Sequence, residues 1–323
     1  MRWVVTGGLG FIGSHFVRLA LRERPAVEIV NLDAMTYAAN PANLRDVEGD
    51  PRYRFIKGDI CDFEAVREAV GTGADALVNF AAETHVDRSI ESAQVFVRTD
   101  ALGTHVLLEA LRRGKISRMV QVSTDEVYGH VPEGASRESD PLRPRSPYAA
   151  SKAAGDLLTL AYHTTYALPV LITRGSNTYG PNQYPEKIVP LFITNLLDDR
   201  PVPVYGDGLQ IRDWLYVEDH ARGVLGVLER GEPGSVYNVG GGTPMTNMAL
   251  TQVLIDACGG SMERHVEHVT DRLGHDRRYA LDSSRLHALG WKPRVAFAEG
   301  IARTIQWYRQ NEAWWRPLKE PVG

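Results

Sequence analysis

The chain has 323 residues, of which 43% are hydrophobic and 24% are charged. This balance is typical of a globular protein with one large domain or two domains of moderate size. The formal net charge of −4 provides no excess of positive charge for binding nucleic acid or an anionic membrane surface.

The first half of the chain alternates short apolar runs with longer amphipathic runs, which is typical of βαβ units around a parallel sheet. Strands are predicted at Arg2–Thr6, Glu28–Leu32, Arg54–Lys57, Ala76–Phe80, Met119–Ser123 and Val170–Arg174. Helices are predicted between them, at Ile12–Arg24, Phe63–Val70, Val95–Arg113 and Ala149–Tyr166. Most of these strands are apolar without alternation, as expected where helices cover both faces of a sheet. We therefore predict an α/β fold with a doubly wound parallel-sheet Rossmann domain over residues 1–175.

A glycine-rich turn directly follows the first predicted strand, and it reads Thr6-Gly7-Gly8-Leu9-Gly10-Phe11-Ile12-Gly13. Glycines permit a tight turn and the close approach of backbone to a pyrophosphate, while the N-terminus of the next helix offers free N–H groups. A tight turn between strand and helix needs no ligand, but the position of this pattern favours a dinucleotide site. Asp33 then ends the second strand, 20 residues after Gly13, where a carboxylate accepts hydrogen bonds from ribose hydroxyls. Because that carboxylate would repel a 2′-phosphate, NAD is favoured over NADP; alternatively, Asp33 is a solvated loop acid.

A tyrosine and a lysine stand at i and i+4 in Tyr148-Ala149-Ala150-Ser151-Lys152, on one face of a predicted helix. The lysine is expected to stabilise the tyrosinate and lower the pKa of the phenol from its reference near 10. Such a tyrosinate can take the proton of an alcohol while hydride leaves for a nicotinamide. Most isolated pairs of this kind are a surface lysine and a half-buried tyrosine. Together with the glycine turn, however, the chain resembles the extended short-chain dehydrogenase/reductase family over essentially its whole length.

Two adjacent acids, Asp125 and Glu126, follow Thr124 at the end of the fifth predicted strand. In the resembled family the position of Thr124 carries a hydroxyl that holds the substrate alcohol, and sugar epimerases have small, non-acidic residues at the next two positions. Two carboxyls in one pocket tend to titrate apart, which supplies the acid and the base that elimination of water needs. The alternative is that both acids cap the following turn or lie in solvent. The motif resembles that of dTDP-glucose 4,6-dehydratases.

After about Gly175, glycine, proline and asparagine cluster and loops dominate. Helices are predicted at Ile188–Leu197, His220–Glu229, Met248–Cys258 and Phe297–Gln310. We predict a smaller α/β substrate-binding lobe over residues 176–323, although Trp214–Glu229 could return to the first domain as a further strand and helix. The tail after Trp315 is predicted to be poorly ordered.

The resemblance to dTDP-glucose 4,6-dehydratases implies three sets of site residues, and each member of the substrate set could otherwise be an ordinary surface residue. The catalytic set is Thr124, Asp125, Glu126, Tyr148 and Lys152. The cofactor set is Gly7, Gly10, Phe11, Ile12, Gly13, Asp33, Thr36, Asp59, Ile60, Phe80, Ala81, Ala82, Thr84, Thr99, Tyr148, Lys152 and Thr178. The substrate set is Thr84, Thr124, Asn177, Glu186, Lys187, Pro203, Val204, Tyr205, Arg212, Asn247, Arg272 and His275. Within it, Arg212 is expected to pair with the diphosphate, because a planar guanidinium suits anionic oxygens.

Three positions depart from the resembled pattern. Asp100 stands where asparagine is usual, Thr178 replaces an asparagine, and Asn182 replaces an aromatic residue. The first two are expected to change hydrogen bonding near the cofactor, and the third bears on the identity of the sugar or base.

The sequence thus predicts an NAD-dependent lyase that oxidises, dehydrates and re-reduces a nucleotide-linked hexose. Tyr148 is expected to deprotonate the 4-hydroxyl, Glu126 to remove the C5 proton and Asp125 to protonate the departing 6-hydroxyl. A dehydratase of UDP-linked sugars, a 4-epimerase of the same fold and a non-catalytic NAD-binding protein are the alternatives. The resemblance also implies a homodimer through helices near Val95–Arg113 and Ala149–Tyr166. The charge balance and the lack of a spanning segment predict no nucleic-acid or membrane partner.

Cysteine content and the first residues bear on location. Cys61 and Cys258 are too few for a disulfide framework, and neither lies in a Cys-x-x-Cys pattern, so a metal or redox site has no support. The chain begins with a strand-like run, Trp3-Val4-Val5, without the pattern of a signal peptide or spanning helix. We expect a cytoplasmic protein.

Overall fold

A seven-stranded parallel sheet is the centre of the computed structural model, which describes residues 1–319. The strand order is β10-β6-β5-β4-β1-β2-β3. The strands are β1 (Arg2–Thr6), β2 (Glu28–Asp33), β3 (Tyr53–Lys57), β4 (Ala76–Asn79), β5 (Met119–Thr124), β6 (Val170–Gly175) and β10 (Val236–Val239). Because β1 pairs with β2 on one side and β4 on the other, the order reverses there and leaves a crevice at the carboxyl ends of the strands. This arrangement confirms the predicted Rossmann fold.

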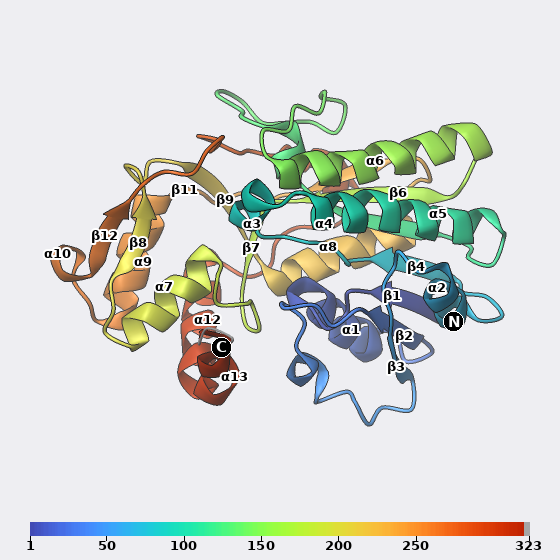
Figure 1. Ribbon diagram of the computed structural model, residues 1–323, viewed down its shortest axis with the longest axis horizontal. Helices are drawn as coiled ribbons and strands as arrows, with labels where there is room; N and C mark the ends of the chain where they lie inside the picture. The colour runs from blue at the N-terminus through green and yellow to red at the C-terminus, as the bar shows by residue number, and fades with distance from the viewer. Residues whose placement is uncertain (320–323) are drawn as a thin grey trace.

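Helices cover both faces of this sheet (Figure 1). One face packs against α1 (Phe11–Glu23) and α8 (Val217–Arg230), and the other against α2 (Phe63–Val70), α5 (Thr104–Arg112) and α6 (Pro147–Tyr166). Within β1, Trp3 and Val5 belong to the first core while Val4 belongs to the second. Both kinds of side chain are therefore buried, which explains why the strands lack an alternating pattern.

The predicted helix over Val95–Arg113 is interrupted. The structure has a short α4 (Gln94–Phe96), a π-helical turn η2 (Val97–Gly103) and then α5. The turn lies directly against α6, because a Cβ added to Gly155 would be 2.8 Å from the carbonyl oxygen of Asp100. Single π-helical turns often occur at functional sites.

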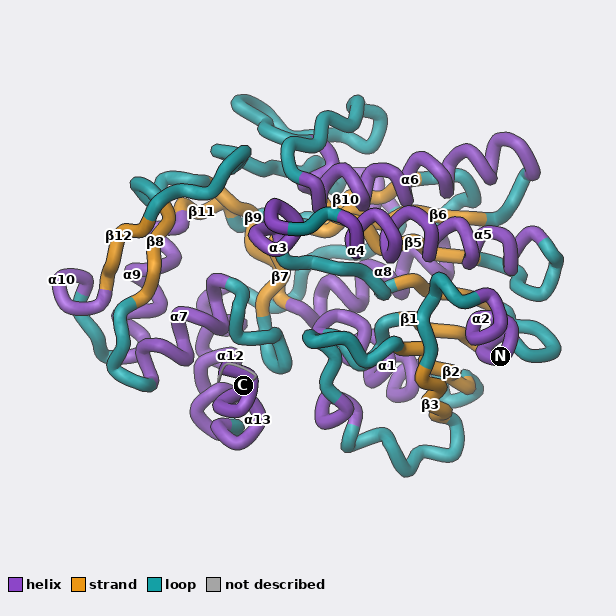
Figure 2. The backbone as a smooth tube through the Cα atoms, viewed as in Figure 1, coloured by secondary structure: helices purple, strands orange, loops and turns teal. Residues whose placement is uncertain are grey.

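The second lobe contains two small sheets and several helices (Figure 2). One sheet joins β7 (Asn177–Tyr179), β9 (Ile211–Tyr216) and β11 (Pro244–Thr246), and the other joins β8 (Val202–Tyr205) and β12 (Val266–Val269). The main helices are α7 (Ile188–Leu197), α9 (Asn247–Cys258), α12 (Phe297–Gln310) and α13 (Glu312–Lys319). The short helix α10 (Met262–His265) packs on α9, while the short helices η1 (Pro41–Leu44), α3 (Val86–Glu91) and α11 (Ser284–Ala288) pack on elements of the large-sheet domain. Tyr179, Phe192, Trp214 and Trp315 lie in the core of this lobe.

The chain does return to the large sheet, although not as predicted. Helix α8 packs on β5 and β6, but the strand before it, β9, belongs to the second lobe. The returning strand is instead β10, which pairs with β6.

The prediction of poor order after Trp315 is wrong for residues 316–319, which complete α13. The buried Trp315 indole anchors this helix by donating a hydrogen bond of 2.8 Å to the carbonyl of Tyr308. The rest of the predicted disordered tail lies outside the described residues. Among the helices at residues 1–319, none has both the length and the apolar character that a membrane span requires. A cytoplasmic location stays a prediction from the sequence.

Candidate active site

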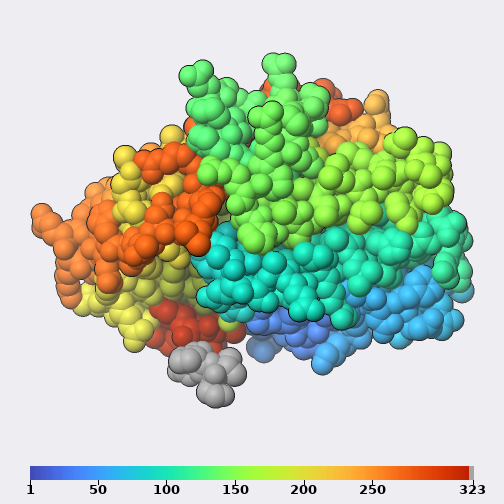
Figure 3. Space-filling view, turned by 45° about the horizontal axis from the view of Figure 1, so that its top comes forward, coloured from blue at the N-terminus to red at the C-terminus, as the bar shows by residue number. Residues whose placement is uncertain are grey.

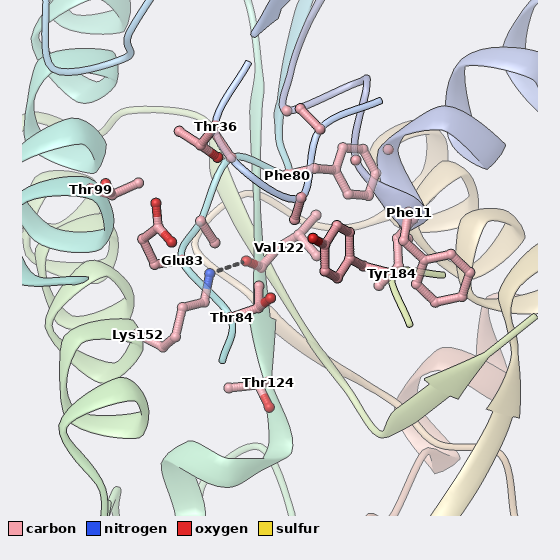
Figure 4. A pocket seen from close by; sticks show the side chains of 18 of the residues that line it. Phe11, Thr36, Phe80, Glu83, Thr84, Thr99, Val122, Thr124, Lys152 and Tyr184 are labelled. Carbon is pink, nitrogen blue, oxygen red and sulfur yellow. Dashed lines mark hydrogen bonds between the residues drawn. The ribbon is translucent and has the colours of Figure 1, made fainter. Parts of the chain in front are cut away.

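A cavity of about 380 Å³ lies at the carboxyl ends of the large sheet (Figure 4). All seventeen residues of the predicted cofactor set and all five of the predicted catalytic set line it. Five residues of the substrate set also line it: Thr84, Thr124, Asn177, Glu186 and Lys187. The structure therefore brings residues 7 and 187, and most of the predicted site between them, to one place.

The glycine turn has the shape that a dinucleotide diphosphate requires. Gly7 has a φ of +68°, and a Cβ there would lie 2.6 Å from the backbone nitrogen of Ala81. Helix α1 starts after Gly10 with no side-chain cap and no acidic residue in its first turn. Its first N–H groups and the positive end of its dipole are therefore available to an anion, with Phe11 and Ile12 lining the cavity.

Asp33 is held in place at the end of β2 and is only 6% exposed. Its carboxylate accepts hydrogen bonds from the backbone N–H groups of Leu9, at 2.9 Å, and Met35, at 2.8 Å. Burial raises the pKa of Asp33, while these two N–H groups act in the opposite direction. The interpretation of Asp33 as a solvated loop acid is therefore wrong, and the residues present fit NAD.

Tyr148 and Lys152 lie one turn apart on α6, which begins after Ser146; the Ser146 hydroxyl accepts from the N–H of Ala149. The ammonium of Lys152 donates a 2.8 Å hydrogen bond to the carbonyl of Val122 (Figure 4). The expected lowering of the phenol pKa is wrong. Burial and then the charge of Glu126 raise the pKa of Tyr148 well above its ordinary value, and the Thr124 hydroxyl opposes this rise.

Asp125 and Glu126 begin the short helical turn η3 (Asp125–Tyr128) directly after β5. The Thr124 hydroxyl accepts from the N–H of Glu126 and donates to Asp125, both at 3.2 Å. Asp125 is 3% exposed, Glu126 is half-buried, and both line the cavity, so the alternative that the two acids lie in solvent is wrong. The side chain that caps the turn is that of Thr124.

The two acids have different surroundings. Burial, then the charge of Glu126 and then that of Asp213 raise the pKa of Asp125 well above its usual range. Burial also raises the pKa of Glu126, but the cations Arg212 and Lys187 oppose that rise. Of the two, Asp125 is therefore the one favoured as the protonated acid, and Glu126 is the one that ionises more readily.

Glu186 lines the cavity and is contacted by side chains from two other segments of the chain. The Tyr37 hydroxyl donates a 2.8 Å hydrogen bond to one oxygen of Glu186, and the Arg88 guanidinium lies 3.6 Å from the other. Arg88 also stacks 3.7 Å from the centre of the Tyr37 ring. Lys187 donates to the carbonyl of Thr84. Sequence reasoning missed Tyr37 and Arg88, because each acts only through a partner about 100 to 150 positions along the chain.

The other seven predicted substrate residues do not line this cavity. They lie on or beside β8, β9 and the start of α9: Pro203, Val204, Tyr205, Arg212, Asn247, Arg272 and His275. Arg272 stacks 4.8 Å from the centre of the Tyr205 ring and lies 3.4 Å from Asp87, which closes the second lobe against the first. Figure 3 shows this contact between the orange segment near residue 270 and the cyan segment near residue 90.

Arg212 is the link between this second group and the acids. It is 7% exposed and donates to the carbonyls of Ile211 and Asp276, both at 2.9 Å. Its charge opposes the rise in the pKa of Glu126. Tyr279, which sequence reasoning missed, lies under the Arg212 guanidinium and 3.5 Å from the Glu126 carboxylate.

The structure shows the hydrogen-bond partners of two positions that depart from the resembled pattern, Thr178 and Asn182. The Thr178 hydroxyl donates to the carbonyl of Ser176 at 3.0 Å and lies 2.7 Å from Nδ1 of His220, so it does change bonding at the cavity wall. Asn182 has a φ of +65° and hydrogen-bonds Asn43 and Arg18 instead of lining the cavity. The expectation that Asn182 bears directly on the sugar or base is therefore not supported by its place in the fold.

Comparison with known proteins gives consistent results. Residues 4–304 match the family model described as GDP-mannose 4,6 dehydratase. A dTDP-glucose 4,6-dehydratase of Streptomyces niveus is 53% identical, over 99% of this chain and 96% of that protein. The crystal structure of a dTDP-glucose 4,6-dehydratase from Streptomyces venezuelae, with NAD and TYD bound, has a TM-score of 0.96 at 52% identity and covers 99% of this chain and 100% of its own. A Thermus thermophilus UDP-glucose 4-epimerase complex with NAD has a TM-score of 0.88 at 34% identity and covers 96% and 100%.

Proposed function

Because the chain belongs to the nucleotide-sugar dehydratase family described as GDP-mannose 4,6 dehydratase, and is similar over its full length to dTDP-glucose 4,6-dehydratases, we infer that it is a dTDP-glucose 4,6-dehydratase. It converts dTDP-glucose to dTDP-4-keto-6-deoxyglucose with NAD as its cofactor. The observation that carries this function is the pair Asp125 and Glu126 beside Tyr148 in one cavity. An epimerase needs the oxidising base but has no water to eliminate.

When bound, NAD supplies the hydride acceptor for oxidation of the sugar and the hydride donor for the final reduction. The start of α1 and the backbone at Gly7 and Gly13 would hold its diphosphate, and Asp33 its adenosine ribose. The buried carboxylate of Asp33 would exclude a 2′-phosphate by charge repulsion.

We assign the base of the oxidation to Tyr148. Its hydroxyl oxygen would take the proton of the hexose 4-hydroxyl, which Thr124 orients from the end of β5. The ammonium of Lys152, fixed on the Val122 carbonyl, would stabilise the negative charge that the tyrosinate carries. The resulting 4-ketone makes the C5 proton acidic enough for the next step.

We assign the elimination to the two acids. Glu126 would take the C5 proton, the C5–C6 double bond would form, and the C6–O bond would break as Asp125 protonates the leaving hydroxyl. The surroundings support this division, because Arg212 and Lys187 favour the charged form of Glu126 while burial and two neighbouring acids favour the neutral form of Asp125. Glu126 would then return a proton to C5 after reduction at C6.

The test is to incubate the purified protein with dTDP-glucose and no added reductant. We expect an alkali-absorbing 4-keto-6-deoxy product with the mass of the substrate less one water. Parallel reactions with UDP-, GDP- and CDP-hexoses test the nucleobase preference. A product of unchanged mass with an inverted 4-hydroxyl would replace this function with that of a 4-epimerase, and turnover of no hexose nucleotide would remove the enzyme assignment.

We also propose that the protein forms a homodimer through η2, α5 and α6. Four large apolar side chains are about half exposed on these neighbouring helices: Val97, Leu102, Leu157 and Tyr166. Exposed apolar side chains on neighbouring helices favour a second copy of the same chain as the partner that covers them. Light scattering should give a dimer mass for the protein and a monomer mass for Leu157→Glu, with Leu209→Glu in the other lobe as the control; a monomeric unaltered protein would refute this.

A further inference from the structure

Asp100 is a buried acid that the reaction described above does not use. It lies in the π-helical turn η2, is 2% exposed, and replaces the asparagine expected at this position. One carboxylate oxygen accepts a 2.6 Å hydrogen bond from the Ser151 hydroxyl, and the other has no hydrogen-bond partner among residues 1–319. The turn can reach α6 this closely because Gly155 has no side chain.

The charged and titratable groups around Asp100 come from two elements. From α6 they are Lys152, Asp156 and Tyr148, and from the segment after β4 the group is Glu83. Lys152, the residue after Ser151 on α6, is the cation of this group, and its charge favours the charged form of Asp100. Burial raises the pKa of Asp100 to about 6, with the charge of Lys152 opposing the rise.

The same charge reaches the phenol. After burial and Glu126, the charge of Asp100 is the next cause that raises the pKa of Tyr148. Lys152 therefore has two anions to offset, the tyrosinate that the reaction needs and the carboxylate of Asp100. With a neutral asparagine in place of Asp100, the positive charge of the Lys152 ammonium would stabilise the tyrosinate alone.

We propose that Asp100 is a positioning residue for the Tyr148–Lys152 pair: its buried carboxylate, held by the Ser151 hydroxyl next to Lys152 on α6, offsets part of the positive charge that Lys152 offers to the tyrosinate. The inference rests on the proposed role of Tyr148 as the base. With less positive charge available to it, the tyrosinate forms at a higher pH and is then a stronger proton acceptor. The protein is therefore less active at low pH, but its base is stronger at neutral pH.

The decisive variant is Asp100→Asn, which keeps the shape and can still accept from Ser151. We expect the low-pH limb of kcat/KM for dTDP-glucose, with NAD bound, to move to lower pH by about one unit. A second readout needs no turnover: the tyrosinate absorbance of the protein is titrated, and the titration of the matching Tyr148→Phe protein is subtracted. It should show the same shift, so a failure of the dehydratase assignment would leave this result interpretable.

The matched control is Asp219→Asn, another buried acid with one unpartnered oxygen among the described residues, placed on α8 away from Lys152. It should leave the limb in place. Ser151→Ala is the second variant: loss of the hydrogen bond raises the pKa of Asp100 further, so the limb should move the same way by less. The proposal would be overturned if the low-pH limb of kcat/KM did not move in either Asp100→Asn or Ser151→Ala. It would also be overturned if these variants lowered kcat equally at every pH. If Asp100→Asn does not fold, the Ser151→Ala result decides.

Discussion

A buried ion pair beneath the catalytic turn gives the sharpest stability prediction. Arg174 on β6 and Asp156 on α6 are 2% and 0% exposed, and their side chains meet at 2.8 Å. Arg174 also donates to the Tyr128 hydroxyl at 2.8 Å, and that hydroxyl donates to Asn238 at 2.8 Å. Since Tyr128 ends the η3 turn that carries the two acids, this network ties the turn to the sheet.

The perturbation is Arg174→Met, which removes the cation and leaves the Asp156 carboxylate buried. Breaking one side of a buried pair costs about 3–5 kcal/mol, whereas replacing both partners by apolar residues is often close to neutral. We therefore expect the free energy of unfolding to fall by about 3–5 kcal/mol in Arg174→Met and to recover most of that loss in Arg174→Met/Asp156→Leu.

The loss should depend on pH in a defined direction. Burial already raises the pKa of Asp156, and the charge of Arg174 opposes that rise. Without Arg174 the folded pKa rises further, so the folded state binds a proton that the unfolded state has released. Stability then falls as pH rises from the unfolded pKa of about 3.9 through the folded value, and Arg174→Met should be least impaired at pH 5 and most at pH 8.

Urea unfolding at these two pH values measures both effects. Arg303→Met is the control, because its partner Glu299 lies in an exposed pair with both side chains about half accessible, where a loss of only about 0.3–0.5 kcal/mol is expected. The reasoning would be refuted if the free energy of unfolding of Arg174→Met lay within about 1 kcal/mol of that of the unaltered protein. It would also be refuted if the double variant were no more stable than Arg174→Met.

Three further predictions concern the cavity. Tyr37→Phe removes the 2.8 Å bond to Glu186, so KM for the sugar nucleotide should rise about ten-fold with kcat little changed in steady-state kinetics; an unchanged KM would exclude a role for this contact. Gly7→Ala places a Cβ 2.6 Å from the Ala81 nitrogen at a φ of +68°, so calorimetry should show loss of NAD binding in a folded protein, whereas Gly49→Ala, with open space at its Cβ, should bind normally. Asp125→Asn and Glu126→Gln should slow product formation by about 10²-fold or more while reduced cofactor still accumulates in single-turnover absorbance; loss of that reduction step in both would contradict the assigned roles.

The sequence by itself determined the local parts of the site. The glycine turn, the position of Asp33, the spacing of Tyr148 and Lys152 and the paired acids after β5 depend on residues close together in the chain. Periodicity and turn chemistry also predict most strands and helices of the large-sheet domain. These local motifs carry the family resemblance that implied the cofactor and catalytic sets, and all of those residues line one cavity.

Tertiary structure decided how these groups are charged and held. The pKa of Tyr148 rises instead of falling, because burial and acids from other elements outweigh a lysine one turn away. The Tyr37–Glu186 bond, the Arg174–Asp156 pair and the place of β10 beside β6 join residues far apart in sequence. No local pattern encodes such contacts, since burial and electrostatic environment exist only after distant segments have packed together.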